Sequence, residues 1–239
     1  MATNDTVIRT EGLTKQFGET IAISDIDLTI TENEIFGLLG PNGAGKSTVV
    51  DILLDHLQPS IGTATVLGHD SRIESPTLHE RIGILGDDYT HHSGMSGIEH
   101  IEFAIASKDA DESPDAILDR VGIDPEVAAR PAGEYSSALA QRLALGMALV
   151  GDPDLLILDE PFSELEPTGV EEAHDIVREE LDHGTTVVLT THRLDQAEAL
   201  CDRIGLMKDG RVLMVVTPAT LRDTIRTNPN LAWWRDHSV

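Results

Sequence analysis

Glycine, lysine and serine stand together in one short stretch with the spacing of a phosphate-binding loop. Residues 40–47 read Gly-Pro-Asn-Gly-Ala-Gly-Lys-Ser: a glycine, four residues, a second glycine, a lysine and a serine. Glycine lets the backbone approach a ligand closely, and the N–H groups of such a loop, with the positive end of the following helix, attract phosphate oxygens. The lysine can reach the outer phosphates, and the serine hydroxyl can bind Mg²⁺. We therefore predict that ATP and Mg²⁺ bind at Gly40, Pro41, Asn42, Gly43, Ala44, Gly45, Lys46, Ser47 and Thr48.

The sequence on either side of this loop supports a binding site over an ordinary glycine-rich turn. Glu34–Leu39 is a short apolar run that predicts a buried strand. Ser47–Leu57 has apolar residues at helical spacing and predicts a helix. A phosphate loop needs this order of strand, loop and helix.

Two carboxylates follow a second apolar run. Leu155–Leu158 is typical of a parallel strand that is covered on both faces, and Asp159 and Glu160 come directly after it. A strand that ends in an acidic turn is common, but parallel sheets bind ligands at the carboxyl ends of their strands. Beside a phosphate loop, we predict that Asp159 holds Mg²⁺ and that Glu160 orients or deprotonates the attacking water.

A histidine follows a third strand. Thr186–Thr190 predicts this strand, and His192 stands two residues beyond it. The imidazole could hydrogen-bond to the γ-phosphate or to the water. A lone histidine after a strand is usually structural, so both interpretations are open on spacing alone.

Strands that alternate with helices predict an α/β fold with a mixed central sheet. Val7–Arg9 and Ala22–Ile30 alternate apolar and polar residues, which predicts an N-terminal antiparallel β lobe. Between Tyr89 and Gly133 the pattern becomes helical and predicts an inserted α-helical lobe. We expect one domain, with a catalytic lobe (about 1–86 and 152–220), a helical lobe (about 88–151) and a C-terminal tail (221–239).

The composition narrows the location and the partners. The chain has 239 residues, with a single cysteine, and no apolar run approaches the roughly 18 residues that span a bilayer. We expect a cytoplasmic protein without a signal peptide, linked to a membrane only through a partner. The formal net charge of −25 repels nucleic acid, so we expect no nucleic-acid partner.

The motifs, taken in order, resemble those of the ATP-binding subunit of ABC transporters, from about residue 6 to 220. Gly40–Thr48 matches the Walker A loop and Leu155–Glu160 matches Walker B with its glutamate. Thr190–His192 resembles the histidine switch, and Gln141–Leu145 resembles the helix behind the signature motif. The resemblance implies a P-loop NTPase of ABC type that hydrolyses ATP and powers a separate membrane-spanning permease.

The resemblance also implies roles for residues that spacing alone does not single out. Phe17, which by itself reads as a core residue, matches the aromatic side chain that stacks on adenine. In this family two subunits close head to tail, and the signature motif of each faces the ATP of the other, which would place Ser136 at the ATP of the second subunit. The protein would then lie peripherally on the inner face of the cell membrane.

The chain departs from the family pattern at three places. The signature segment, Tyr135–Leu139, reads Tyr-Ser-Ser-Ala-Leu where two glycines are usual. If either position needs a positive φ or a close approach, a side chain costs about 1–2 kcal/mol, or about tenfold in affinity. Asp87 stands where glutamine is usual but can still bind Mg²⁺ through water. Glu166 replaces an aspartate, and Phe162 replaces a threonine.

Several alternatives remain open. The chain could pair with a different ATP-binding subunit that supplies a better signature motif, or form a homodimer with two slowed sites. It could be a nucleotide-gated regulatory subunit with weak hydrolysis, or a soluble ATPase that acts on ribosomes or DNA, although its acidity argues against the latter. The transported substrate is not encoded here, whereas the Tyr-Ser form of the signature favours export.

Two further features have ordinary explanations. His91, His92 and His100 match no standard metal site, so a solvated loop is the simpler interpretation, and in the family this stretch lies near the permease. Trp233 and Trp234 predict either a docking patch or a cap on the core.

The excess of acidic residues predicts a dependence of stability on salt. Forty-two acidic residues face 17 basic ones and are spread along the chain, which suggests a halophilic protein in a cytoplasm of high ionic strength. Salt screens the repulsion, so the urea concentration at the midpoint of unfolding should rise as KCl is raised from 0.1 M to roughly 2 M. A midpoint that does not change with KCl would contradict the hypothesis.

Overall fold

The computed structural model describes residues 6–72, 78, 80–87, 89–228, 231 and 234. The chain divides into two compact units. The first unit contains residues 1–74 and 188–239, and the second unit contains residues 75–187. The predicted limits of the catalytic lobe, the helical lobe and the tail stay predictions.

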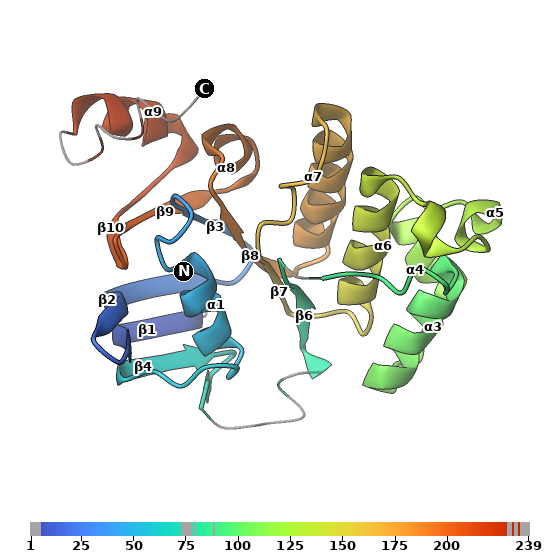
Figure 1. Cartoon of the computed structure of the whole chain (residues 1–239), viewed down its shortest axis with the longest axis horizontal. Helices are drawn as coiled ribbons and strands as arrows, with labels where there is room; N and C mark the ends of the chain where they lie inside the picture. Colours follow the sequence, from blue (N-terminus) through green and yellow to red (C-terminus); the bar gives the residue numbers. More distant parts are fainter. Residues whose placement is uncertain are drawn as a thin grey trace. The chain divides into compact units, whose positions relative to one another are not determined.

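The first unit begins with an antiparallel sheet in the order β2-β1-β4-β5, drawn in blue and cyan in Figure 1. This confirms the predicted N-terminal β lobe. Strand β1 runs to Phe17, well beyond the predicted Val7–Arg9. Register shifts against β2 near Gly12 (φ 56°) interrupt the alternation of apolar and polar residues, so the sequence pattern indicated only the first part of the strand. The strands are β1 (Thr6–Phe17), β2 (Thr20–Thr31), β4 (Ile61–Val66) and β5 (His69–Asp70).

The first unit also holds a mixed sheet in the order β10-β9-β3-β8. Strands β3 and β9 are parallel, with Leu39 opposite Leu206, and β10 is antiparallel to β9. Helix α1 ends at Leu53, earlier than the predicted Leu57, because Asp55 adopts a left-handed conformation (φ 59°) that a helix cannot continue. The elements are β3 (Ile35–Leu39), α1 (Lys46–Leu53), β8 (Thr186–Thr191, of which residues 188–191 belong to this unit), α8 (Leu194–Leu200), β9 (Arg203–Lys208), β10 (Arg211–Val216) and α9 (Pro218–Thr227).

The core of the first unit tolerates little extra volume beside β3. A Cβ atom on Gly37 would lie 2.5 Å from the Sγ of Cys201, so the strand and the end of α8 touch directly. Burial raises the pKa of the Cys201 thiol, which therefore stays protonated and unreactive. Trp234 is buried, which agrees with a cap on the core and not with an exposed docking patch, whereas Trp233 lies outside the described residues.

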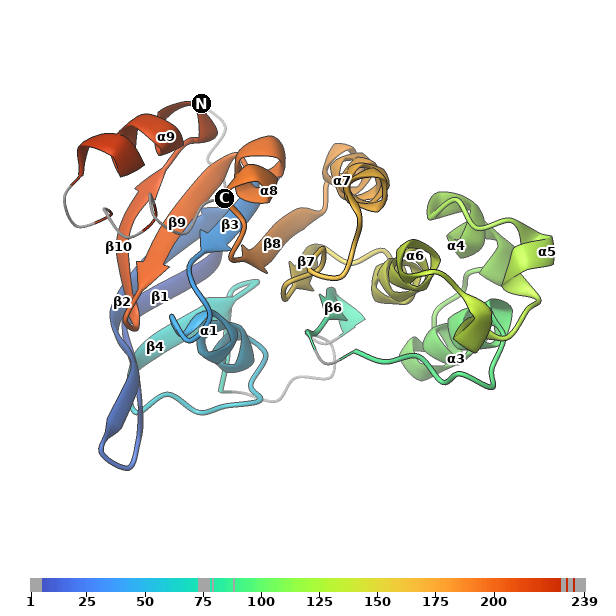
Figure 2. The ribbon, with the colours of Figure 1, turned by 45° about the horizontal axis from the view of Figure 1, so that its top comes forward.

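The second unit combines two parallel strands with a group of helices, as Figure 2 shows. Strand β6 pairs with β7 from Ile82 opposite Leu155 to Leu85 opposite Leu158. All four residues of β7 are fully buried, as its apolar sequence predicts. The elements are β6 (Ile82–Leu85), α3 (Gly97–Lys108), α4 (Pro114–Arg120), α5 (Pro125–Ala128), the short 3₁₀ helix η1 (Ala132–Glu134), α6 (Ser137–Leu149), β7 (Leu155–Leu158) and α7 (Pro167–Asp182).

Polar side chains fix where the helices of the second unit begin. Ser96 and Glu99 form a capping box at α3, and Ser113 and Asp124 accept hydrogen bonds from backbone N–H groups at the starts of α4 and α5. Proline is the first residue of α4, α5 and α7, where its fixed φ suits a helix and its missing N–H costs nothing. These local signals set the first residue of each of these helices.

A buried ion pair joins α4 to α7. Nε of Arg120 lies 2.6 Å from Oε1 of Glu180, whose side chain is fully buried, and a second nitrogen of Arg120 bonds Asp152 at 2.7 Å. Burial alone would lower the pKa of Arg120, but its hydrogen bonds to these two carboxylates outweigh that effect and raise it. Both charges are thus held in a pair whose loss would leave a carboxylate buried without its counterion.

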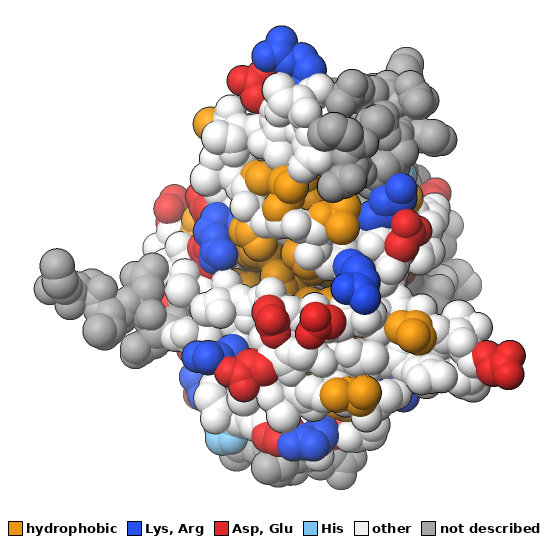
Figure 3. Space-filling model, turned by 90° about the vertical axis from the view of Figure 1, so that its left-hand side faces the viewer, with side chains coloured by type: hydrophobic (Ala, Val, Ile, Leu, Met, Phe, Trp, Pro, Cys, Tyr) orange, Lys and Arg blue, Asp and Glu red, His pale blue; other side chains and the backbone are white. Residues whose placement is uncertain are grey.

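The surface of the first unit carries both charge signs and some hydrophobic side chains. The side seen face-on in Figure 3 shows hydrophobic side chains gathered together, with basic and acidic groups around them. Strand β10 lies on this side, and its Leu213 and Val215 are partly exposed. Among the described residues, no helix combines the length and the apolar character that crossing a bilayer requires.

Candidate functional site

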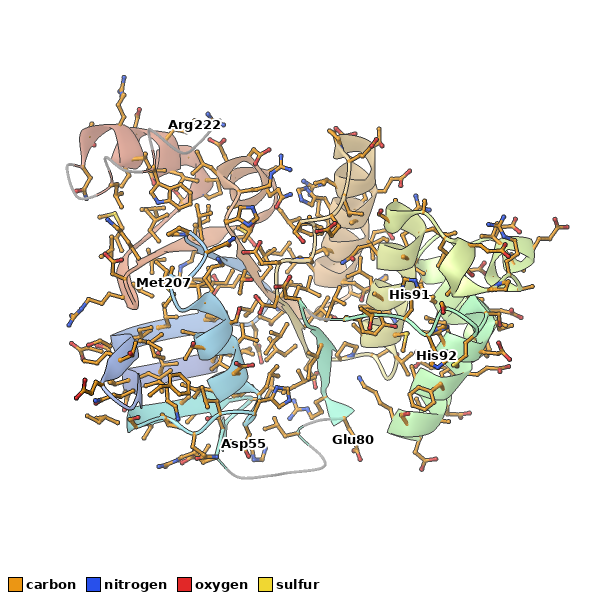
Figure 4. The ribbon with its side chains drawn as sticks, in the orientation of Figure 1. Asp55, Glu80, His91, His92, Met207 and Arg222 are labelled. Carbon is orange, nitrogen blue, oxygen red and sulfur yellow. The ribbon has the colours of Figure 1, made fainter. Side chains whose placement is uncertain are left out.

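The glycines of the phosphate loop are favoured either by a positive φ angle or by the lack of space for a Cβ atom. Gly43 and Gly45 have positive φ angles of 79° and 100°. A Cβ atom on Gly45 would lie 2.6 Å from Cγ2 of Ile23, and one on Gly40 would lie 2.5 Å from the carbonyl oxygen of Met207, a residue labelled in Figure 4. The loop therefore lies directly against β2 and β9, and its shape depends on glycine.

Backbone hydrogen bonds anchor the loop at both ends. The N–H of Gly40 donates to the carbonyl of Thr191 at the end of β8, at 3.1 Å. The N–H of Gly210, in the turn between β9 and β10, donates to the carbonyl of Ala44 at 3.0 Å. The carbonyl of Gly210 in turn accepts from the N–H of Ser24 on β2, at 2.8 Å. Three strands distant in sequence thus hold the loop in one conformation.

Lys46 lies inside the loop and is only 5% exposed. Its Nζ donates to the carbonyl of Gly40 at 2.9 Å and contacts that of Pro41 at 3.4 Å. No side chain caps α1, which begins at Lys46, so its first N–H groups and its positive end are directed at the loop. Ser47, Asn42 and the other exposed residues of the loop can be reached by a ligand. This arrangement suits a phosphate chain.

Phe17 stands at the end of β1, in register with Thr20 on β2. It is 50% exposed, so the expectation from its sequence position alone, a core residue, is wrong. An exposed aromatic ring offers a flat apolar surface to a base. The ammonium group of Lys15 lies 5.0 Å from the centre of this ring, a contact that the sequence pattern did not single out.

His192 follows β8 in a turn that its neighbours fix. Thr191 is buried, and its hydroxyl donates to Oε1 of Gln196 at 2.9 Å and accepts from the N–H of Arg193 at 3.1 Å. The imidazole of His192 itself is exposed. Because Thr191 also accepts the hydrogen bond of Gly40, the histidine and the phosphate loop are linked through one residue.

In the second unit, Asp159 and Glu160 follow β7 as predicted. Asp159 is 7% exposed, and its N–H donates to the carbonyl of Leu85 at 2.8 Å. Glu160 has a positive φ of 50°, which is uncommon for a residue with a side chain and is typical of functional sites. The backbone after β7 therefore turns sharply at the glutamate.

Asp87 lies at the same edge of this pair of strands. Strands β6 and β7 are parallel, with Leu85 opposite Leu158, so Asp87 and Asp159 both follow the carboxyl ends of neighbouring strands. Asp87 is exposed. Two carboxylates at one sheet edge provide oxygen ligands of the kind that Mg²⁺ prefers.

The signature segment forms the start of α6. Ser136 is the N-cap residue, and its Oγ accepts from the N–H of Leu139 at 3.3 Å. Ser137 and Ala138 are helical and have no positive φ, so the conditional cost of backbone strain does not arise at these two positions. Ala138 instead packs toward α7, where a Cβ atom on Gly169 would lie 3.1 Å from that of Ala138.

The segment between β7 and α7 contains the other departures from the family pattern. Phe162 is buried and packs edge-to-face against His174, with ring centres 4.7 Å apart. Glu166 is exposed and precedes the first residue of α7, where its side chain makes no capping hydrogen bond. The phenylalanine is thus a core residue, while the glutamate is available at the surface.

The histidines near α3 have a structural role. His100 is buried, its Nε2 accepts from the N–H of His92 at 2.9 Å, and its Nδ1 lies 2.8 Å from the carbonyl of Ser96. The ring of His91 packs against it edge-to-face, with ring centres 6.2 Å apart. Both ring nitrogens of His100 are therefore engaged, and within the described part of the chain no group of three metal-binding side chains was found.

The predicted residues fall into two groups. The first unit brings together the phosphate loop and the turn at His192. Phe17 lies in the same unit, on β1, which pairs with the strand β2 that the loop contacts. The second unit holds Asp87, Asp159 and Glu160 at the ends of β6 and β7, and Ser136 at the start of α6. Their roles toward a ligand stay predictions.

Comparison with known proteins identifies the family. The family model described as "ABC transporter" matches residues 23–163, more than half of the chain. The daunorubicin/doxorubicin resistance ATP-binding protein DrrA of Streptomyces peucetius is 37% identical over 226 residues, which cover 92% of this chain and 68% of that protein. The bacitracin transport ATP-binding protein BcrA of Enterococcus faecalis is 33% identical over 219 residues, covering 90% and 70%.

Solved structures agree on the fold. The ADP conformation of MJ1267, an ATP-binding cassette of an ABC transporter, superposes with a TM-score of 0.84 at 22% identity and covers 96% of this chain and 98% of that one. The dimeric structure of MJ0796, a bacterial ABC transporter cassette, gives 0.79 at 23% identity, covering 88% and 98%. Because the family model matches more than half of the chain and DrrA is 37% identical to it, the chain belongs to the ABC transporter family.

Proposed function

We propose that this ATPase is the ATP-hydrolysing subunit of an exporter and works with a separate membrane-spanning permease. The observation that carries the proposal is the anchored phosphate loop with Lys46 inside it. The relatives support export, because DrrA is named for drug resistance and the fluoroquinolone relative of Mycobacterium tuberculosis, 36% identical, is named an export ATP-binding protein. The cargo of those proteins is not transferred to this chain.

In the proposed reaction, the loop binds the phosphates of ATP and Phe17 stacks on the base. Lys46 and the backbone N–H groups neutralise the phosphate oxygens. Glu160 accepts a hydrogen bond from the attacking water and draws its proton, and His192 hydrogen-bonds to the γ-phosphate or to that water.

The oxygen donors Ser47, Asp87 and Asp159 would hold Mg²⁺. One hydroxyl and two carboxylates are oxygen donors that fit this hard cation, which would supply positive charge to the phosphate oxygens. The exposed position of Asp87 agrees with a contact through water.

The partner proposals rest on the altered signature segment. Ser136 offers its hydroxyl at the start of α6, as the family pattern expects, while Ser137 and Ala138 add side chains at the exposed start of that helix. We propose that the second ATP-binding subunit is a copy of this chain or a related chain, closed head to tail, and that the complex lies on the inner face of the cell membrane. The acidic composition supports work at high ionic strength, for which the salt dependence of unfolding is the test.

Replacing Lys46 by Ala should weaken the binding of Mg²⁺-ATP by about 10- to 100-fold, because charged hydrogen bonds to the phosphates are lost. Isothermal titration calorimetry measures the dissociation constant. Arg226→Ala, which removes one positive charge from an exposed position on α9, is the matched control and should leave binding unchanged. Unaltered ATP affinity in the Lys46 variant would refute the phosphate site.

Replacing Glu160 by Gln should leave ATP binding intact but lower the turnover by at least about 100-fold, because the amide cannot take the proton of the water. Phosphate release reports turnover, and size-exclusion chromatography with ATP should detect a stabilised dimer. Glu171→Gln, on the exposed face of α7, is the control. Turnover at the normal rate in the Glu160 variant would exclude this residue as the base.

The choice between a copy of this chain and a different second subunit can be measured. If the altered signature segment needs a better partner, the purified chain should hydrolyse ATP slowly, and membranes that contain its companion chains should accelerate it. The assay compares phosphate release with and without the complex recovered from membranes, whose chains are identified by mass spectrometry. Fast, cooperative hydrolysis by the chain alone would show that no different ATP-binding subunit is needed.

A further inference from the structure

Lys15 connects the exposed ring of Phe17 to the segment that follows the phosphate-loop helix. Its Nζ donates to the carbonyl of Gln58 at 2.6 Å and lies 5.0 Å from the centre of the Phe17 ring. A second bond joins the same segments, because the N–H of Gln16 donates to Oγ of Ser60 at 3.0 Å. The end of β1 is therefore tied to the chain that leaves α1.

The carbonyl that holds Lys15 is itself part of an ordered turn. The side chain of Gln58 bonds the carboxylate of Asp55, labelled in Figure 4, and Asp55 is the left-handed residue that ends α1. The N–H of Ser60 donates to the carbonyl of Thr14 at 2.8 Å. Lys15 is thus anchored to a turn whose position depends on the helix of the phosphate loop.

A cation over one face of an aromatic ring limits how the ring can turn. At an exposed site, the free energy of this cation–ring attraction is large enough to change the affinity for a ligand by a few-fold. Half of Phe17 nevertheless stays exposed, so a flat group can still reach the ring. The carbonyl of Gln58 holds the ammonium group beside the ring, and the cation favours one orientation of the ring before a base arrives. A ring that is already oriented loses less entropy on stacking.

We propose that Lys15 is a positioning residue that acts through Phe17 on the base of the nucleotide. The proposal rests on the proposed stacking of Phe17 and adds the group that sets the orientation of the ring. A different lysine, Lys46, serves the phosphates in the proposed reaction, and the carbonyls of the loop hold it there. The charge of Lys15 is engaged by a ring and a carbonyl, so it should affect the binding of the base and not that of the phosphates.

The test compares a ligand that has a base with one that lacks it. Calorimetry gives the dissociation constants of Mg²⁺-ATP and Mg²⁺-triphosphate for the unaltered protein, Lys15→Met, Phe17→Ala and the double variant. Lys15→Met should weaken ATP by about two- to fivefold and leave triphosphate unchanged. In the Phe17→Ala background, Lys15→Met should have no further effect on ATP. Lys15→Arg keeps a cation and should retain the affinity of the unaltered protein.

Three results would overturn the role of Lys15 and leave the stacking role of Phe17 in place. They are an unchanged ATP affinity in Lys15→Met, an equal loss of triphosphate affinity in that variant, or a further loss of ATP affinity when Lys15→Met is added to Phe17→Ala. If Lys15→Met does not fold, Lys15→Gln removes the charge but keeps a donor for the carbonyl of Gln58 and gives the same comparison. ATP affinity that Phe17→Ala does not change would overturn the stacking role and this one with it. No ATP binding by the unaltered protein would overturn the proposed function itself.

Discussion

The close backbone contact between the phosphate loop and its neighbouring strands is the constraint on which the first unit depends. Gly40 and Gly45 lie where a Cβ atom would overlap the carbonyl of Met207 and the side chain of Ile23. The turn at Gly210 bonds both the loop and β2. A loop that binds phosphate through its N–H groups must hold them in place before the ligand arrives, and here three strands do so.

The parts of the site that could be predicted from the sequence are those that local pattern encodes. The phosphate loop, the two carboxylates and the turn at His192 each follow an apolar run. The structure has a strand at each of these runs, namely β3, β7 and β8. The start of α6 is likewise set by a local signal, because the hydroxyl of Ser136 accepts a hydrogen bond from the N–H of Leu139. Local signals thus gave most of the fold and the order of its motifs.

Interactions between distant residues could not be predicted in this way. Glu180 is a fully buried acid within an amphipathic helix, and its pairing with Arg120, 60 residues earlier, makes that burial tolerable. The continuation of β1 to Phe17 depends on bulges that interrupt the alternation, and the contact of Lys15 with Gln58 joins residues 43 apart. No periodicity within a short window contains such information.

The altered signature segment shows how the structure changes an argument based on residue types. Loss of two glycines suggested a strained backbone, but Ser137 and Ala138 are ordinary helical residues. Any loss of affinity must therefore come from the side chains themselves. Ser137 is exposed at the start of α6, where the proposed second subunit would approach, whereas Ala138 is half-buried. A serine hydroxyl can hydrogen-bond to a phosphate oxygen, whereas the methyl group of Ala138 cannot and packs toward α7 instead. The effect of the two changes on a shared nucleotide need not have the same sign, so a weak signature does not follow from the missing glycines alone.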